Sequence, residues 1–199
     1  MTKNIRQLKI RLLFSTIQIL SYEKFDINII SKACVNIGIQ KEYAKLLFPN
    51  GRLELLNEFS NYINKKMIKR INKELIAITS ITTRIFESIK IRLEILEKYK
   101  FAISKITTFY SKPWNYSKAY LYIWNTMNII WRIGGRDNST DINYYTKRGL
   151  LTGIYLSTIL FWLSDNSTHY QETYRLLNRK LKTITTIGRQ INSFTTKVL

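Results

Sequence analysis

The chain has 199 residues, of which 45% are hydrophobic, and a formal net charge of +19 from 32 Lys and Arg against 13 Asp and Glu. This length predicts one domain that buries a sizeable core without a metal ion or a disulfide. A single cysteine and a single histidine exclude an intrachain disulfide, zinc fingers and Cys–His hydrolases. Seven Gly and two Pro are too few for the many turns of an all-β sandwich.

Signals for export or membrane insertion are missing from the pattern. No apolar core of signal-peptide type follows the charged N-terminus. The longest uncharged run, residues 149–164, is shorter than the roughly 20 residues of a transmembrane helix and is interpreted as a core helix. Cys34 lies in an apolar stretch and is interpreted as a buried hydrophobe, whereas His169 lies in a polar turn and is expected in solvent.

Apolar positions recur at helical spacing along most of the chain, so the expected fold class is all-α. Residues 78–83 are either a helix start or a frayed link. The helix that ends at residue 163 is capped by Ser139, Thr140 or Asp141. The other expected helices are residues 3–21, 27–37, 40–48, 53–72, 85–99, 101–110, 113–133 and 171–190.

Two short predicted helices, 27–37 and 40–48, meet across Gly38 after a longer first helix, as in a helix-turn-helix unit. This order of elements resembles the TetR family of bacterial repressors, with a three-helix head at 1–50 and a body of long helices at 51–199. The head either contacts DNA bases or serves packing alone. Residues 40–48 hold no Arg to bind guanine, and Glu42 would repel phosphate, so a specific nucleic acid is not an expected partner.

A longer motif lies in the second half. Residues 131–148 read Trp-Arg-Ile-Gly-Gly-Arg-Asp-Asn-Ser-Thr-Asp-Ile-Asn-Tyr-Tyr-Thr-Lys-Arg, and Asp-Asn-Ser follows at 165–167. This stretch resembles the ubiquinone-biosynthesis accessory proteins of mitochondria and alphaproteobacteria, whose pattern is Gly-Asp-x-Ser-Thr-Asp-x-Asn-Trp-Tyr-Thr-x-Arg. Leu-Phe-Pro-x-Gly at 47–51 also recurs in that family. The resemblance runs from about Arg11 to Gln190. Tyr144 replaces the family's Trp, and the loop at 134–136 carries one extra residue.

The resemblance implies a TetR-like helical bundle without a repressor role. It implies a homodimer built from the last long helices and an apolar pocket for an isoprenoid lipid or ubiquinone precursor. It also implies docking on the demethoxyubiquinone hydroxylase. No cofactor and no metal are expected, because a single His and a single Cys exclude a His-rich metal site. Mitochondrial members continue into a separate amphipathic helix that holds the membrane, whereas here only residues 191–199 remain. The net charge is therefore expected to hold the protein at an anionic membrane surface. The expected location is cytoplasmic, peripheral at the inner membrane of a bacterium.

The start of the helix near residue 141 is polar and aromatic, and Tyr, Trp and Arg are typical anchors of protein interfaces. In the alternative interpretation, Asp141 only caps the helix and the two tyrosines are partly buried. The resemblance favours a surface that binds the hydroxylase. The residues expected in this surface are Asp141, Asn143, Tyr144, Tyr145, Lys147 and Arg148.

The same helix continues a stripe through Leu151, Tyr155, Thr158 and Trp162, and Gly149 and Gly153 are expected to bring another backbone close. The helix from Pro113 carries aromatic or Met side chains that form either a core or the wall of an apolar cavity, at Trp114, Tyr116, Tyr120, Tyr122, Trp124, Met127 and Trp131. A polyprenyl tail needs apolar burial and no polar motif. The expected lipid pocket comprises Trp124, Met127, Trp131, Leu151, Ile154, Tyr155 and Thr158.

No catalytic constellation is recognised, because Glu87, Glu94 and Glu97 are interpreted as ion-pair partners on a basic helix. The sequence therefore predicts a non-catalytic, lipid-binding accessory protein that presents quinone precursors to the hydroxylase. The alternative is a TetR-like DNA-binding transcription regulator that senses an apolar ligand. A third interpretation is a structural helical dimer without a ligand.

Overall fold

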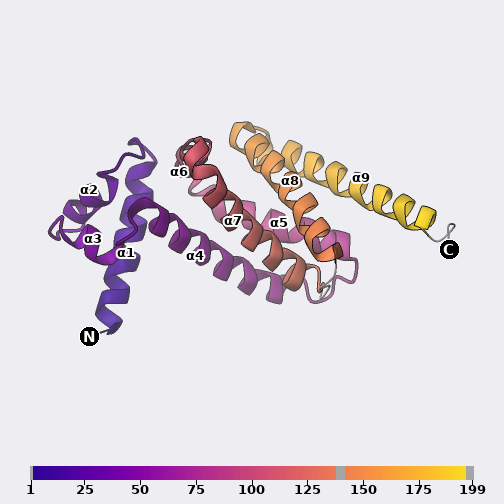
Figure 1. The fold of residues 1–199 in the computed structure, drawn as a ribbon, viewed down its shortest axis with the longest axis horizontal. Helices are drawn as coiled ribbons and strands as arrows, with labels where there is room; N and C mark the ends of the chain where they lie inside the picture. The colour runs from indigo at the N-terminus through magenta and orange to yellow at the C-terminus, as the bar shows by residue number, and fades with distance from the viewer. Residues whose placement is uncertain (1, 138–141, 196–199) are drawn as a thin grey trace. The chain divides into compact units, whose positions relative to one another are not determined.

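The computed structural model describes residues 2–137 and 142–195, with side chains described for residues 4–137 and 144–183. Every regular element within these residues is a helix, which confirms the all-α prediction (Figure 1). In chain order the elements are α1 (Thr2–Leu20), α2 (Ile29–Asn36), α3 (Tyr43–Leu47), α4 (Gly51–Glu74), α5 (Ile81–Glu97), α6 (Lys100–Tyr110), α7 (Pro113–Ile129), a π-helix η1 (Ile130–Gly134), α8 (Ile142–Ser164), a 3-10 helix η2 (Thr168–Tyr170) and α9 (Gln171–Thr195).

The helices form two compact units. The first unit comprises residues 1–65 and 96–122, and the second comprises residues 66–95 and 123–199. The first unit thus contains the predicted three-helix head together with the start of α4, α6 and the first turns of α7.

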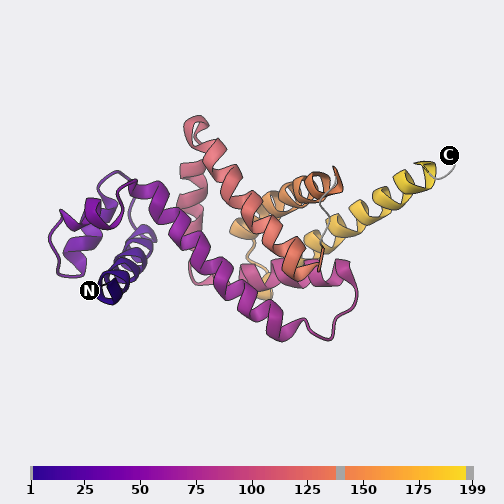
Figure 2. The ribbon, with the colours of Figure 1, turned by 60° about the horizontal axis from the view of Figure 1, so that its bottom comes forward.

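In the first unit, α1 packs against α2 (Figures 1 and 2). The amide of Asn36 donates a 3.0 Å hydrogen bond to the hydroxyl of Ser15 on α1. Gly38 has a positive φ of 76°, and the next residue, Ile39, donates its N–H to the carbonyl of Cys34. Glycine suits this left-handed position and ends α2 there. Cys34 is fully buried, as predicted.

The start of α4 is tied to α1 by a carboxylate. Glu54 accepts a 2.7 Å hydrogen bond from the ammonium of Lys9 and one from the backbone N–H of Asn50. The Lys9 ammonium also lies 4.9 Å from the centroid of Phe48, which is buried. Gly51 takes a positive φ of 58° at the first residue of α4. This turn fixes the direction in which α4 leaves the head.

The second unit has an apolar core that includes Met127, Trp162 and Leu177, each fully buried. In this unit α8 and α9 pack side by side (Figure 1). Their link is anchored by Asp165, which accepts hydrogen bonds from the N–H and the hydroxyl of Thr173 at 2.9 and 2.5 Å. Burial favours a higher pKa for Asp165, but these bonds and those from Ser167 outweigh it and lower its pKa to about 2.

Most helix bounds lie close to the predicted ones. The segment 78–83 is a helix start, because α5 begins at Ile81. The candidate recognition helix is shorter than predicted, since α3 covers only Tyr43–Leu47. The helix expected to run to residue 133 changes to a π-helix at Ile130, and π-turns widen a helix locally.

The aromatic first half of α7 was expected in a core or a cavity wall, and for three residues this prediction is wrong. Trp114, Tyr116 and Tyr120 are 72%, 62% and 44% exposed. Asn115 and Ala119 occupy the inward side of these turns instead.

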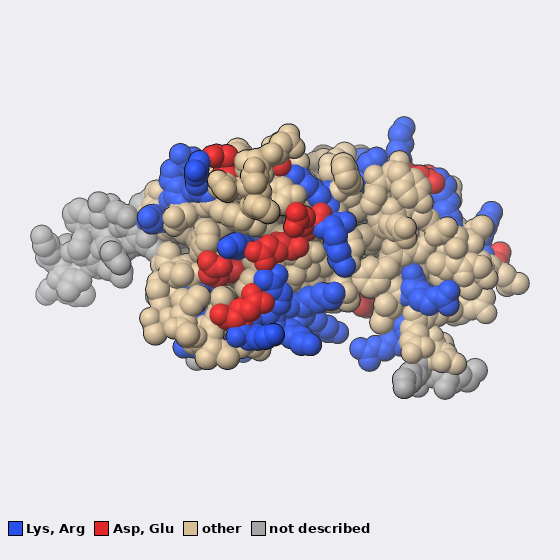
Figure 3. Space-filling model, turned by 180° about the vertical axis from the view of Figure 1, so that it is seen from behind, with Lys and Arg blue, Asp and Glu red and all other residues tan. Residues whose placement is uncertain are grey.

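None of the helices in the described part of the chain is both long enough and apolar enough to cross a membrane. The face drawn in Figure 3 carries many Lys and Arg side chains, with several acidic side chains gathered in one area and others scattered over the face.

Candidate functional site

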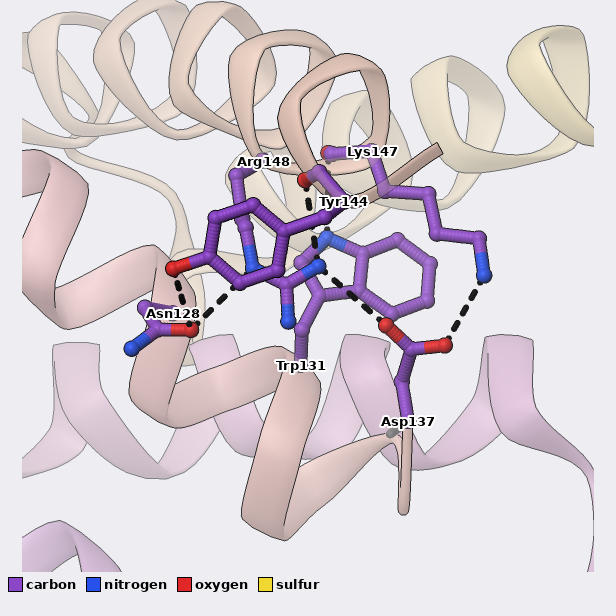
Figure 4. A network of polar contacts seen from close by, with 6 residues as sticks. All are labelled: Asn128, Trp131, Asp137, Tyr144, Lys147 and Arg148. Carbon is purple, nitrogen blue, oxygen red and sulfur yellow. Dashed lines mark hydrogen bonds and ion pairs between the residues drawn. The ribbon is translucent and has the colours of Figure 1, made fainter. Parts of the chain in front are cut away.

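A network of polar contacts joins α7, η1, the loop that follows them and the first turns of α8 (Figure 4). All of its members belong to the second unit. Three of them, Tyr144, Lys147 and Arg148, belong to the predicted partner-binding set. The full network comprises Asn128, Trp131, Asp137, Tyr144, Lys147 and Arg148.

The centre of the network is the guanidinium of Arg148, whose side chain is fully buried. It donates to Asn128 Oδ1 at 3.1 Å, to the Tyr144 carbonyl at 3.1 Å and to Asp137 Oδ2 at 3.2 Å. The Tyr144 ring stacks over it, with 3.7 Å between the guanidinium carbon and the ring centroid. The Nη2 amino group of this buried cation has no hydrogen-bond partner among the residues that the structure describes. A charge this deep is tolerated because a carboxylate, two oxygens and a π-face surround it.

Asp137 pins the loop before α8 to the helix itself. Its second carboxylate oxygen accepts a 2.8 Å hydrogen bond from the ammonium of Lys147. The indole N–H of Trp131 donates to the Lys147 carbonyl at 3.0 Å, and the Lys147 ammonium lies 5.7 Å from the indole centroid. Asp137 therefore neutralises two cations of α8 at once and holds the start of that helix against η1.

A second buried arginine, Arg84 on α5, supports the other end of this loop. Its guanidinium donates to the carbonyls of Gly134, Ile133, Leu75 and Ile78. Carbonyls at helix ends lack intrahelical partners and carry partial negative charge, so a cation there is stabilising. Arg84 thereby caps the end of η1 and holds the chain just after α4.

The two loop glycines are required by space. A Cβ at Gly134 would lie 2.3 Å from the hydroxyl of Ser88, and one at Gly135 would lie 2.8 Å from the Trp131 carbonyl. Both distances are shorter than any tolerated carbon–oxygen contact. The extra residue that sequence comparison notes in this loop is thus accommodated by side chains of minimal size.

Tyr145 is the network's outward neighbour. It is 64% exposed and stacks on Trp124 of α7, with ring centroids 6.3 Å apart and planes 29° apart. Its ring also meets the edge of Tyr144 at 5.0 Å. Trp124 and Tyr144 thus hold the exposed Tyr145 ring in one orientation and form an apolar surface with it. Such a surface suits protein recognition, because its side chains lose little conformational entropy on binding.

The predicted partner-binding residues therefore separate by depth. Tyr145 lies at the surface, Tyr144 and Lys147 are partly buried, and Arg148 lies beneath them and cannot touch a partner directly. Asp141 lies outside the described residues, and the side chain of Asn143 is not described. Arg148 acts on this surface by positioning Tyr144 and Asp137.

The predicted lipid-pocket residues all lie in the second unit, on α7, η1 and α8. Trp124 and Trp131 are partly exposed. The five buried ones are Met127, Leu151, Ile154, Tyr155 and Thr158. The Tyr155 hydroxyl accepts a 2.9 Å hydrogen bond from Arg92 of α5, which is also buried. The stripe from Arg148 to Trp162 faces inward as its spacing predicts.

Gly149 and Gly153 differ from the expectation in one respect. They lie on the outward side of α8, and within the described chain nothing comes within 4 Å of a Cβ at either position. If they bring a backbone close, it belongs to another molecule.

Sequence reasoning missed Asn128, Asp137 and Arg84. Asp137 belongs to the quoted Gly-Asp-x-Ser-Thr-Asp motif, but the motif does not reveal its ion pairs with Lys147 and Arg148. Asn128 gives no signal in a helical pattern, and Arg84 is indistinguishable in sequence from the other cations around it. The described residues contain no group of three or more His, Cys, Asp or Glu side chains placed to hold a metal ion.

Comparison with known proteins finds similarity to COQ9 ubiquinone biosynthesis proteins. The COQ9 family model matches residues 116–188, which include the whole network. A probable ubiquinone biosynthesis protein coq9 of mitochondria from Dictyostelium discoideum is 25% identical over 209 residues, covering 96% of this chain and 68% of that protein. The mitochondrial ubiquinone biosynthesis protein COQ9 of Homo sapiens is 22% identical over 189 residues, covering 92% of this chain and 59% of that protein.

A shorter match has a higher identity. The COQ9 protein of Xenopus tropicalis is 39% identical over 62 residues, which is 31% of this chain and 19% of that protein. Among solved structures, a TetR transcriptional regulator from Nitrosomonas europaea matches with a TM-score of 0.72 and 16% identity, covering 89% of this chain and 97% of that one. The matches confirm both the family resemblance noted from the motif at residues 131–148 and the TetR-like fold.

Proposed function

We propose that this chain, as a relative of the COQ9 ubiquinone biosynthesis proteins, is a non-catalytic factor of ubiquinone biosynthesis. In this proposal it binds isoprenoid quinone precursors and presents them to the demethoxyubiquinone hydroxylase. The role in ubiquinone biosynthesis rests on these relatives. The observation that supports presentation to a partner is the exposed Tyr145, held over the buried network around Arg148.

The partner-binding part of the proposal draws on how the surface is built. An exposed aromatic that stacks on a second aromatic keeps one orientation, so it can enter a partner's pocket with little loss of side-chain entropy. The cations beneath it are already paired with Asp137, so binding requires no new neutralisation of Arg148 or Lys147. The working form is proposed to be a homodimer, for which the open outward face at Gly149 and Gly153 leaves room.

The lipid-binding part is supported by the apolar interior of the second unit. Met127, Leu151 and Ile154 are buried on adjoining helices, and a polyprenyl tail would exchange water for such a surface at about 25 cal/mol per Å². Within this interior the Tyr155 hydroxyl and Arg92 offer polar atoms that suit a quinone oxygen. The protein is proposed to work peripherally at a membrane, and its relatives' names place them in mitochondria.

Capture of the hydroxylase by the full chain tests the partner-binding part. We expect Tyr145→Ala to weaken capture at least tenfold, because interface aromatics commonly contribute 2 kcal/mol or more, about 30-fold in affinity. Tyr22→Ala is the matched control, since Tyr22 is 67% exposed in the first unit. Equal capture by the wild type and Tyr145→Ala would reject the surface.

A further inference from the structure

The first two turns of α7 bury only a narrow side of the helix. Between residues 113 and 121 only Asn115 and Ala119, four residues apart, are buried. The wide remaining arc exposes Trp114, Tyr116, Tyr120 and Leu121, with 63% of the Leu121 side chain accessible. Large apolar side chains exposed together on two successive turns of a helix mark a binding region more often than ones scattered singly over a surface.

These side chains follow the corner between α6 and α7, which is held by hydrogen bonds. The amide of Asn115 donates a 3.0 Å hydrogen bond to the carbonyl of Phe109, which closes the turn between α6 and α7. Ser111 donates to the Thr108 carbonyl at 2.9 Å. From α4, the guanidinium carbon of Arg52 lies 4.9 Å from the centroid of Phe109. The exposed aromatics therefore project from a fixed base within the first unit.

Along the sequence, the charged side chains from Lys98 to Lys118 all have one sign. Five lysines lie between residues 98 and 118, and no Asp or Glu occurs between Glu97 and Asp137. Lys112 and Lys118 are exposed, and the ammonium of Lys112 lies 5.8 Å from the Trp114 ring centroid. We name the combined set the corner patch. It comprises Lys112, Trp114, Tyr116, Lys118, Tyr120 and Leu121.

We propose that the corner patch docks on the surface of a bilayer that carries anionic lipid headgroups. Trp and Tyr are the residues enriched at the level of the headgroups, where an apolar ring body and a polar tip are both satisfied. Lysine ammonium groups beside them reach the phosphates while their stems stay on apolar surface. The inference rests on the proposed peripheral location and assigns it to particular residues, and its test requires no bound quinone.

The composition of the patch favours a bilayer over a protein. Protein interfaces enrich Tyr and Trp together with Arg, and they deplete Lys. The corner patch has the aromatics, but its cations are lysines alone. A lysine needs no bidentate partner, so it suits a fluid array of phosphates better than a fixed protein surface.

Vesicle binding by the full chain tests the proposal. The probes are phosphatidylcholine vesicles with and without phosphatidylglycerol. At about a fivefold loss in affinity per lysine removed, Lys112→Gln with Lys118→Gln should weaken binding to the anionic vesicles about 25-fold. Lys41→Gln with Lys45→Gln is the matched control, because both lysines are exposed in the head and the net charge changes equally. We expect the control to lose less than about threefold.

Equal losses in the two double variants would overturn the proposal, because binding would then follow the net charge alone. A second readout is tryptophan fluorescence with brominated lipid as quencher. Trp114 should shift to the blue and be quenched on anionic vesicles, and Trp114→Phe should remove that response. Absence of both in the wild type, or a response that survives in Trp114→Phe, would also overturn it.

Discussion

Replacing Arg148 with Met tests how the start of α8 is held. The substitution keeps the length of the side chain and removes an ion pair to Asp137 and hydrogen bonds to Asn128 and the Tyr144 carbonyl. Breaking a buried pair costs about 3–5 kcal/mol. Asp137 keeps Lys147 as its partner, and the substitution also removes the Nη2 group, which has no partner within the described part of the chain. We therefore expect the lower end, about 3 kcal/mol.

Urea unfolding measures this loss. With a slope of about 2 kcal/mol per molar urea, the midpoint should fall by about 1.5 M. Arg175→Met is the matched control, since Arg175 pairs with Glu172 on the surface, where both side chains are more than half exposed. The control should change stability by less than about 0.5 kcal/mol. If Arg148→Met costs no more than Arg175→Met, the buried network does not hold the helix.

The remaining predictions concern Asp165 and the glycines. Because the folded pKa of Asp165 is depressed to about 2, its stabilisation is present above the unfolded pKa of about 4 and disappears as the pH falls toward 2. Asp165→Asn should therefore lower the free energy of unfolding by about 2 kcal/mol at pH 7, measured in urea. The unfolding free energies of the wild type and the variant should converge as the pH falls from 5 to 2, and a difference that stays constant with pH would contradict the lowered pKa of Asp165. Gly134→Ala should lower stability by about 1–3 kcal/mol through the clash with Ser88, and an unchanged urea midpoint would show that the loop relaxes. Gly149→Ala should raise monomer stability by up to about 1 kcal/mol, but it should weaken association in sedimentation if a second copy packs there.

The helices were predictable because apolar residues recur at helical spacing even though the chain is rich in β-branched Ile and Thr. The stripe from Arg148 through Tyr155 to Trp162 is buried throughout, as a period of 3.6 residues requires. The interface argument and the family resemblance placed one charged residue of this stripe, Arg148, at the surface with its neighbours. Its depth depends on Asp137 and Asn128, which come from other elements, and helical spacing carries no information about such partners.

The aromatic content of α7 was visible in the sequence, but its direction was not. Asn115 points inward because its amide reaches the carbonyl of Phe109 at the end of α6. With Asn115 and Ala119 on the inward side, Trp114 and Tyr116 face solvent. A hydropathy pattern places the aromatic residues inward and the Asn outward, so it predicts the opposite orientation.

The lipid carried by the protein tests the central claim most directly. The full chain would be purified from a host that makes ubiquinone, and its bound lipids would be extracted and identified by mass spectrometry. The account predicts an isoprenoid quinone or its precursor, near one per chain or one per dimer. Recovery of phospholipid alone, or of no lipid, would contradict a role in binding quinone precursors.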